Sequence, residues 1–76
     1  MTNSELNKKF INSLSKDMQL IILSNIANHY GVSYNEAKKE IFDKDSENIL
    51  DYVTGRERSS IKIVYSRFMY NINKNK

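Results

Sequence analysis

The chain has 76 residues, enough for one small domain, and its twelve basic and nine acidic side chains give a formal net charge of +3. It contains no cysteine, which excludes disulfides and thiolate zinc sites, and no apolar run approaches the roughly 20 residues that span a bilayer. The first residues do not place a basic segment before an apolar one, so we expect no secretory signal and a soluble, cytoplasmic protein.

The charges are distributed unevenly along the chain. Residues 18–35 carry no formal charge, and residues 36–51 have three lysines against six acidic side chains. Residues 52–76 have six basic side chains against Glu57 alone. The basic part of the chain is therefore its C-terminal segment, and this segment weakly favours an anionic partner.

Caps and apolar spacing predict two helices in the first half of the chain. Thr2 and Glu5 form a capping box that opens a first helix. Its expected apolar face consists of Leu6, Phe10, Ile11 and Leu14. Ser15 caps a second helix that runs to about Tyr30 and is apolar over more than half of its circumference. We expect this second helix to be central and to bury Met18, Leu20, Ile22, Leu23, Ile26, Ala27 and Tyr30.

Caps and apolar spacing in the second half of the chain predict three further helices. Gly31 can adopt φ > 0 and end the second helix, and Ser33 with Glu36 forms a capping box for a third helix over residues 34–43. Asp45 or Ser46 caps a short fourth helix, with Gly55 as its C′ residue.

A fifth helix is expected over residues 56–72, with residues 73–76 frayed. Its apolar stripe consists of Ile61, Val64, Tyr65, Phe68 and Ile72. The expected fold is an all-α single domain, residues 1–76, of four to five short helices.

The order Ala27-x-x-x-Gly31-Val32-Ser33 resembles the helix-turn-helix of bacterial transcription regulators. The resemblance implies that the third helix reads DNA, as part of a homodimer that binds two half-sites. The side chains that would contact nucleic acid are Tyr34, Asn35, Lys38 and Lys39. Two carboxylates of that helix, Glu36 and Glu40, oppose this interpretation because they would face phosphates, and Glu40 stands where those regulators place an apolar residue.

Arg56, Arg58 and Lys62 form a basic group at the start of the fifth helix. They are candidates for phosphate contacts in the same DNA-binding hypothesis. The other interpretation is that they pair with the acidic segment 36–51 across the fold. We favour the pairing slightly, because the two segments have opposite charge and are adjacent in sequence.

The sequence offers little for catalysis or metal binding. His29 is the only histidine and is predicted to be solvated at the polar edge of its helix. Asp43, Asp45 and Glu47 alternate as in a calcium loop, but the sixth position is asparagine and the twelfth is threonine. We expect helix capping there, no metal, no cofactor and no enzymatic activity.

Two surfaces are candidates for binding a protein partner. The first is an acidic set that would enter a basic groove as a mimic of DNA phosphates. Its members are Glu36, Glu40, Asp43, Asp45 and Glu47. The second is a ridge on the fifth helix, where Arg67 lies between Ile63 and Tyr70. Such a combination is typical of interface hot spots, although another helix or a second copy of the chain could equally cover it.

A longer pattern covers two consecutive segments. Residues 29–41 have the pattern His-Tyr-Gly-Val-Ser-x-x-Glu-Ala-x-x-Glu-Ile, and residues 43–53 have the pattern Asp-x-x-Ser-Glu-x-Ile-Leu-Asp-Tyr-Val. Together they resemble a group of small all-helical accessory proteins of phages and other mobile elements. The resemblance implies a protein of the bacterial host cell that acts as a regulator, a host-takeover protein or an anti-CRISPR-like inhibitor of a defence system. We expect a non-catalytic protein that binds a bacterial protein or nucleoprotein complex, with a helix-turn-helix regulator as the alternative.

Overall fold

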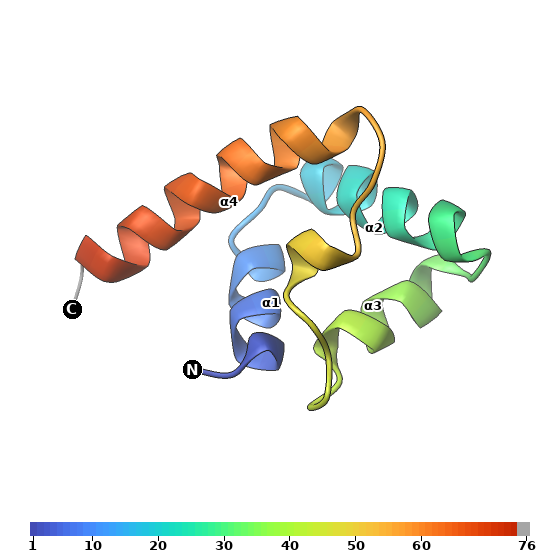
Figure 1. Cartoon of the computed structure of the whole chain (residues 1–76), viewed down its shortest axis with the longest axis horizontal. Helices are drawn as coiled ribbons and strands as arrows, with labels where there is room; N and C mark the ends of the chain where they lie inside the picture. The colour runs from blue at the N-terminus through green and yellow to red at the C-terminus, as the bar shows by residue number, and fades with distance from the viewer. Residues whose placement is uncertain (75–76) are drawn as a thin grey trace.

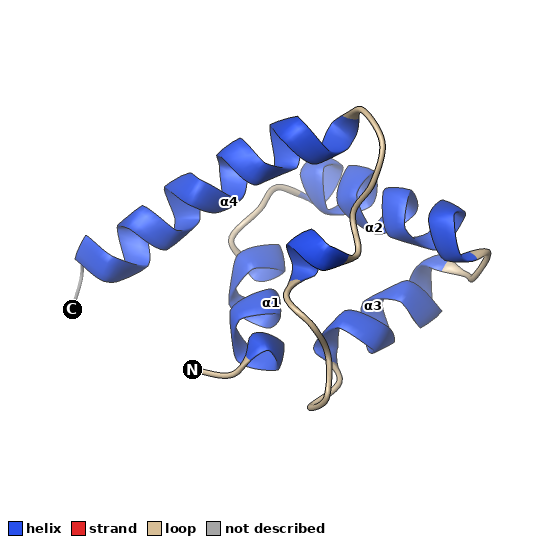
Figure 2. Cartoon of the chain, in the orientation of Figure 1, coloured by secondary structure: helices blue, strands red, loops and turns tan. Residues whose placement is uncertain are grey.

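The computed structural model describes residues 1–74, which form four α-helices and one short 3₁₀ helix (Figures 1 and 2). The elements are α1 (Asn3–Asn12), α2 (Lys16–Tyr30), α3 (Tyr34–Phe42), η1 (Ile49–Asp51) and α4 (Glu57–Lys74). These residues contain no strand, which confirms the expected all-α class. The fraying expected at 73–76 falls partly on 75–76, which lie outside the described residues, whereas α4 includes residues 73 and 74.

The predicted caps of the first three helices are confirmed. Thr2 Oγ1 accepts the N–H of Glu5 at 3.2 Å, and the Glu5 carboxylate accepts the N–H of Thr2 at 3.4 Å. The hydroxyl of Ser15 caps α2, and that of Ser33 caps α3 within a second capping box. Gly31 ends α2 with φ of 67°, a left-handed conformation that favours glycine. The turn between α2 and α3 therefore occupies only residues 31–33.

The hydrophobic core takes side chains from all four α-helices and from η1, and η1 lies among the helices (Figure 1). Its fully buried side chains include Phe10, Ile11, Ile22, Leu23, Ile41, Ile49 and Ile61. Two residues expected in this core are exposed instead, Leu20 by 55% and Tyr30 by 50%. Leu20 lies beside the buried stripe of α2 rather than on it, and Tyr30 belongs to the last turn, past the packed part of the helix.

A buried polar side chain of α1 joins three backbone groups of the α3–η1 segment. Asn7 is completely buried, and its amide donates to the carbonyls of Ile41 at 2.8 Å and Glu47 at 2.9 Å. Its carbonyl oxygen accepts the N–H of Ile49 at 3.0 Å. Ser4 adds a hydrogen bond of 2.8 Å to the carbonyl of Phe42. The last carbonyls of α3, which have no partner within their own helix, are thus bonded by side chains of α1.

The predicted fourth helix is a single turn, and its expected caps are wrong. Asn48 caps η1 by accepting the N–H of Leu50, whereas the Ser46 hydroxyl donates to the carbonyl of Ile41. Side chains from other parts of the fold bond the backbone groups that precede η1. The N–H of Glu47 donates to the Tyr52 hydroxyl, and Asn7 holds the next groups along the chain. Gly55 has φ of 74°, but it lies in the loop before α4 and not at a helix C-terminus.

The last helix, α4, packs on α2 and η1 through its N-terminal half and extends beyond the rest of the molecule (Figure 1). Ile61 and Tyr65 are buried, whereas Phe68 and Ile72 are only half-buried. The ring of Phe10 lies 5.0 Å from that of Tyr65 and 5.3 Å from that of Phe68. The predicted stripe therefore faces the core, but its coverage decreases toward the C-terminal end.

Candidate binding surface

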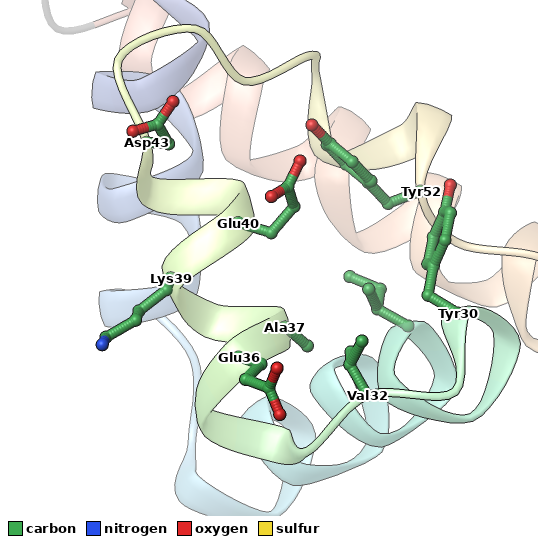
Figure 3. Close-up of a pocket in the computed structure, with 9 residues that line it drawn as sticks. Tyr30, Val32, Glu36, Ala37, Lys39, Glu40, Asp43 and Tyr52 are labelled. Carbon is green, nitrogen blue, oxygen red and sulfur yellow. The ribbon is translucent and has the colours of Figure 1, made fainter.

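A cavity of about 530 Å³ lies between the end of α2, the outer face of α3 and the residue that follows η1 (Figure 3). Two tyrosines and three carboxylates surround a floor of aliphatic side chains. The lining residues are Ile26, Tyr30, Val32, Glu36, Ala37, Lys39, Glu40, Asp43 and Tyr52. We call this feature the α3 groove. It combines apolar area with a few polar groups, as ligand pockets commonly do.

Tyr30 and Tyr52 form one wall of the α3 groove. Their ring centroids are 6.0 Å apart at an interplanar angle of 65°. The Tyr52 side chain is fixed because it is buried and its hydroxyl accepts the N–H of Glu47 at 3.0 Å. Tyr30 is half exposed and packs edge-on against His29, with ring centroids 4.7 Å apart. One aromatic ring is therefore held rigidly, and the other has freedom to adjust.

The Tyr52 hydroxyl is a neutral donor beside the carboxylates. Burial raises the pKa of Tyr52 above its ordinary value of 10.0. The nearby charges of Glu40 and Glu47 act in the same direction, and the hydrogen bond from the Glu47 backbone opposes them. Because the phenol stays protonated at neutral pH, the Tyr52 hydroxyl can donate to a group in the groove while it accepts the backbone N–H.

The opposite wall of the α3 groove is acidic. Glu36 and Glu40 lie one turn apart on the side of α3 that faces the cavity, and Asp43 follows as the C-cap residue of the helix. Glu36 accepts the N–H of Ser33, and Asp43 accepts a backbone N–H two residues later. The Glu40 carboxylate points across the cavity toward Tyr52, whereas the ammonium of Lys39 points away from the tyrosines (Figure 3). The groove itself is therefore negatively charged.

The structure separates the predicted acidic set into two groups. Three of its five members line the α3 groove, and the other two, Asp45 and Glu47, are exposed in the segment after α3. The aromatic and aliphatic lining is not evident from the sequence, because the apolar pattern predicts Tyr30 in the core and the motif places Val32 in the turn. Their position between two helices, beside the carboxylates, follows from the tertiary packing.

The ridge predicted on α4 is exposed and lies away from the α3 groove. Ile63 is 58% exposed and Tyr70 is 65% exposed, with exposed Arg67 between them. No other part of the described chain covers this face. Because α4 packs on α2 and η1, these elements separate the ridge from α3 (Figure 1). The two candidate protein-binding surfaces are therefore distinct regions of the molecule.

The residues predicted to bind nucleic acid lie on two separate surfaces, and three of them, Asn35, Lys38 and Lys39, line one open groove together with Lys8. Asn35 and Lys39 are exposed on α3, whereas Tyr34 and Lys38 are half-buried. The Lys38 ammonium lies 5.9 Å from the centroid of the Phe42 ring, on the side of α3 that faces α1. The basic group at the start of α4, which contains Arg56, Arg58 and Lys62, is exposed on the other side of α2 (Figure 1). The expected charge pairing was with the acidic segment 36–51, and this separation disfavours it for the part of that segment that lies on α3.

Other candidate chemistry is absent from the part of the chain that the structure describes. Within residues 1–74, no group of three histidine or acidic side chains could hold a metal ion. Over the same range, no helix has both the length and the apolar character needed to cross a bilayer. Comparison with models of protein families, with curated proteins and with solved structures found no match. The functional assignment is therefore argued from the α3 groove and the residues around it.

Proposed function

We propose that this protein is a non-catalytic binding module that docks the acidic face of α3 against a basic surface of another protein. The observation that carries this proposal is the charge of that face. A DNA-binding surface would carry basic side chains, whereas this groove is lined by Glu36 and Glu40 of α3 and by Asp43, which follows the helix. Carboxylates repel phosphates and attract lysine and arginine, so the groove suits a surface that itself binds nucleic acid.

The resemblance to accessory proteins of phages and mobile elements suggests the kind of partner. A bacterial nucleoprotein complex has a basic channel for its nucleic acid, and an acidic module in that channel would exclude the phosphates. In this proposal the protein inhibits such a complex, as an anti-defence protein would, by occupying the channel. The ridge on α4, with Ile63 and Tyr70 exposed, supplies an apolar contact on a second region of the partner.

Two charge-reversal variants, one inside the α3 groove and one outside it, test the proposal. The first variant combines Glu36→Lys with Glu40→Lys, and the control combines Asp45→Lys with Glu47→Lys. Both variants change the net charge equally, but only the first alters the groove. We expect the tagged wild-type protein to capture a partner from nuclease-treated bacterial lysate and to inhibit nucleic-acid binding by the purified partner.

The groove variant should lose affinity for that partner by at least about tenfold, which corresponds to 1.4 kcal/mol, while the control stays close to wild type. Equal loss in both variants would show that only the net charge matters. Unchanged affinity in the groove variant would exclude the acidic face of α3 as the contact. Either result would overturn the proposal.

DNA reading by α3 is the second candidate function, and one observation favours it. The α2 helix, a turn of residues 31–33 and α3 follow each other as in a helix-turn-helix, with α1 packed behind α3. A DNA reader of this type would lose affinity for duplex DNA steeply as salt rises, and Lys39→Ala would weaken its binding. Fluorescence anisotropy on a pool of duplexes separates the two functions, because we expect no wild-type binding at physiological salt.

A further inference from the structure

We infer that the α3 groove is a receptor for a single arginine side chain of the partner protein, held beside Tyr30 and Tyr52 with its guanidinium against Glu40. This inference rests on the proposed function and names the chemical group that the site recognises.

The α3 groove is large enough to admit one long side chain. Its volume of about 530 Å³ lies within the range of roughly 300–1,000 Å³ typical of small-molecule sites. The floor is aliphatic and consists of Ile26, Val32 and Ala37. The three methylene groups of an arginine can lie along such a floor while the charged end reaches the carboxylates.

The aromatic wall of the groove favours a cation. The faces of tyrosine rings carry partial negative charge, and arginine is the cation found over them most often. Tyr52 is held in place by burial and by its hydrogen bond from the Glu47 backbone. Tyr30 is half exposed, so its ring can move against an incoming guanidinium. Because the two rings pack against each other at 65°, a planar guanidinium would stack on the exposed Tyr30 ring beside the fixed Tyr52.

Among the carboxylates, Glu40 is the one placed to bind the occupant. Glu36 already bonds the N–H of Ser33, and Asp43 already bonds that of Asp45. Glu40 instead directs its carboxylate across the cavity toward Tyr52 (Figure 3). Two carboxylate oxygens match the parallel N–H groups of a guanidinium, whereas the ammonium of lysine is a point charge without that geometry. The groove should therefore prefer arginine to lysine.

Other occupants fit the groove less well. A phosphate or an acidic side chain would meet three carboxylates in its wall. A neutral apolar side chain would displace water from Glu40 without offering it a hydrogen bond. The ridge of a second copy also carries an arginine, Arg67, on an exposed face. The test below distinguishes this last occupant from an arginine of another protein.

Short peptides in nuclear magnetic resonance titrations provide the test. The ¹⁵N-labelled protein is titrated with acetyl-Gly-Arg-Gly-amide, with the lysine peptide and with the citrulline peptide, which has the shape of arginine without the charge. We expect saturable shifts with the arginine peptide, confined to the amides of groove residues such as Val32, Glu40 and Tyr52. The lysine peptide should bind several-fold more weakly, and the citrulline peptide should cause no saturable shift.

Variants complete the experiment. Glu40→Gln should lower the affinity for the arginine peptide by about tenfold, because the guanidinium loses one charged hydrogen-bond partner. Glu47→Gln, which removes an equal charge outside the groove, should leave its affinity unchanged, and unperturbed spectra elsewhere report an intact fold. Three results would each overturn the inference. They are equal binding of the arginine and citrulline peptides, equal binding of the arginine and lysine peptides, and unchanged binding of the arginine peptide by the Glu40→Gln variant.

Three further outcomes have defined meanings. If the protein's own groove signals shift with its concentration and Arg67→Ala abolishes this change, the occupant is a second copy and the inference is overturned. If the arginine peptide binds as expected but no nucleic-acid-binding partner is captured, the arginine receptor stands and the proposed function fails. If the partner is captured through α3 but no arginine peptide binds, the function stands and the receptor is overturned.

Discussion

The side-chain amide of Asn25 and the backbone of Thr54 exchange two hydrogen bonds. The amide of Asn25 donates to the carbonyl of Thr54 at 2.8 Å, and its oxygen accepts the N–H of Thr54 at 3.0 Å. The side chain thereby pairs with the main chain as a second peptide group would. The contact joins α2 to the loop before α4 and sets where α4 begins.

We predict that Asn25→Asp lowers the free energy of unfolding by about 1–3 kcal/mol, because the Thr54 carbonyl loses its donor and gains a negative neighbour. Urea denaturation followed by circular dichroism measures the change. Asn28→Asp provides the control, because Asn28 is exposed on the same helix. Equal effects of the two variants would contradict a specific role for the Asn25–Thr54 pair.

The buried Asn7 should be more important for stability. Asn7→Ala leaves the carbonyls of Ile41 and Glu47 and the N–H of Ile49 without their partner, so we expect a loss of about 3 kcal/mol or more. The same denaturation experiment on Asn12→Ala, an exposed position of α1, should show little change. If Asn7→Ala does not fold, Ser4→Ala removes only one hydrogen bond and should cost about 1 kcal/mol.

Gly31 provides a test of backbone conformation without a steric contribution. A Cβ added to Gly31 would meet no atom within 4 Å, so the cost of Gly31→Ala comes from the φ of 67°. We expect Gly31→Ala to destabilise the fold by about 1–2 kcal/mol. Gly31→Asn should cost less, because asparagine adopts this conformation more readily. Thermal melts of the two variants should therefore differ, and identical melting temperatures would contradict this explanation.

The capping box of α1 should make stability depend on pH. Hydrogen bonds from Thr2 lower the pKa of Glu5 below 4.5 in the folded protein. The stabilisation from the ionised Glu5 is therefore complete above pH 4.5, the pKa of glutamate in the unfolded chain. It is lost as the pH falls through the lower pKa of Glu5 in the folded protein. We predict that Glu5→Gln melts below wild type at neutral pH and that the difference shrinks in acid. A difference that stays constant through this range would show that the charge of Glu5 contributes nothing.

The α4 helix offers a matched pair of isoleucines, one buried and one on the ridge. Ile61 is 1% exposed and Ile63 is 58% exposed. Ile61→Ala should lower the free energy of unfolding by about 2–5 kcal/mol, whereas Ile63→Ala should change it by no more than about 0.5 kcal/mol. If the ridge contacts the partner, Ile63→Ala should still weaken partner binding in titration calorimetry. An unchanged affinity would exclude Ile63 from the interface.

The local features of this fold were predictable from the sequence, because the residues that make them are neighbours in the chain. Both capping boxes join residues three positions apart, and the role of Gly31 follows from its own conformation. The single turn of η1 was not predictable in the same way. It depends on the buried Asn7, which lies 42 positions before the Ile49 that it bonds. A polar residue on an otherwise apolar face of α1 was the available signal.

The candidate site was predictable only in part, and for a similar reason. The spacing of Glu36, Glu40 and Asp43 places them on one face of any helix, so their grouping needs no tertiary information. Tyr30 and Tyr52 belong to the groove because α2 and η1 bring them together. An apolar pattern does not distinguish a tyrosine in a core from a tyrosine that lines a cavity.

The polar contacts of α1 also determine how the chain folds. Ser4 and Asn7 bond groups that lie 34 to 42 positions later. The end of α3 therefore gains its partners only when the two ends of this long loop have met, and contacts of such separation slow folding. A fragment limited to α2 and α3 would leave those carbonyls unbonded. We therefore expect the two helices that resemble a DNA-binding motif to fold cooperatively with α1.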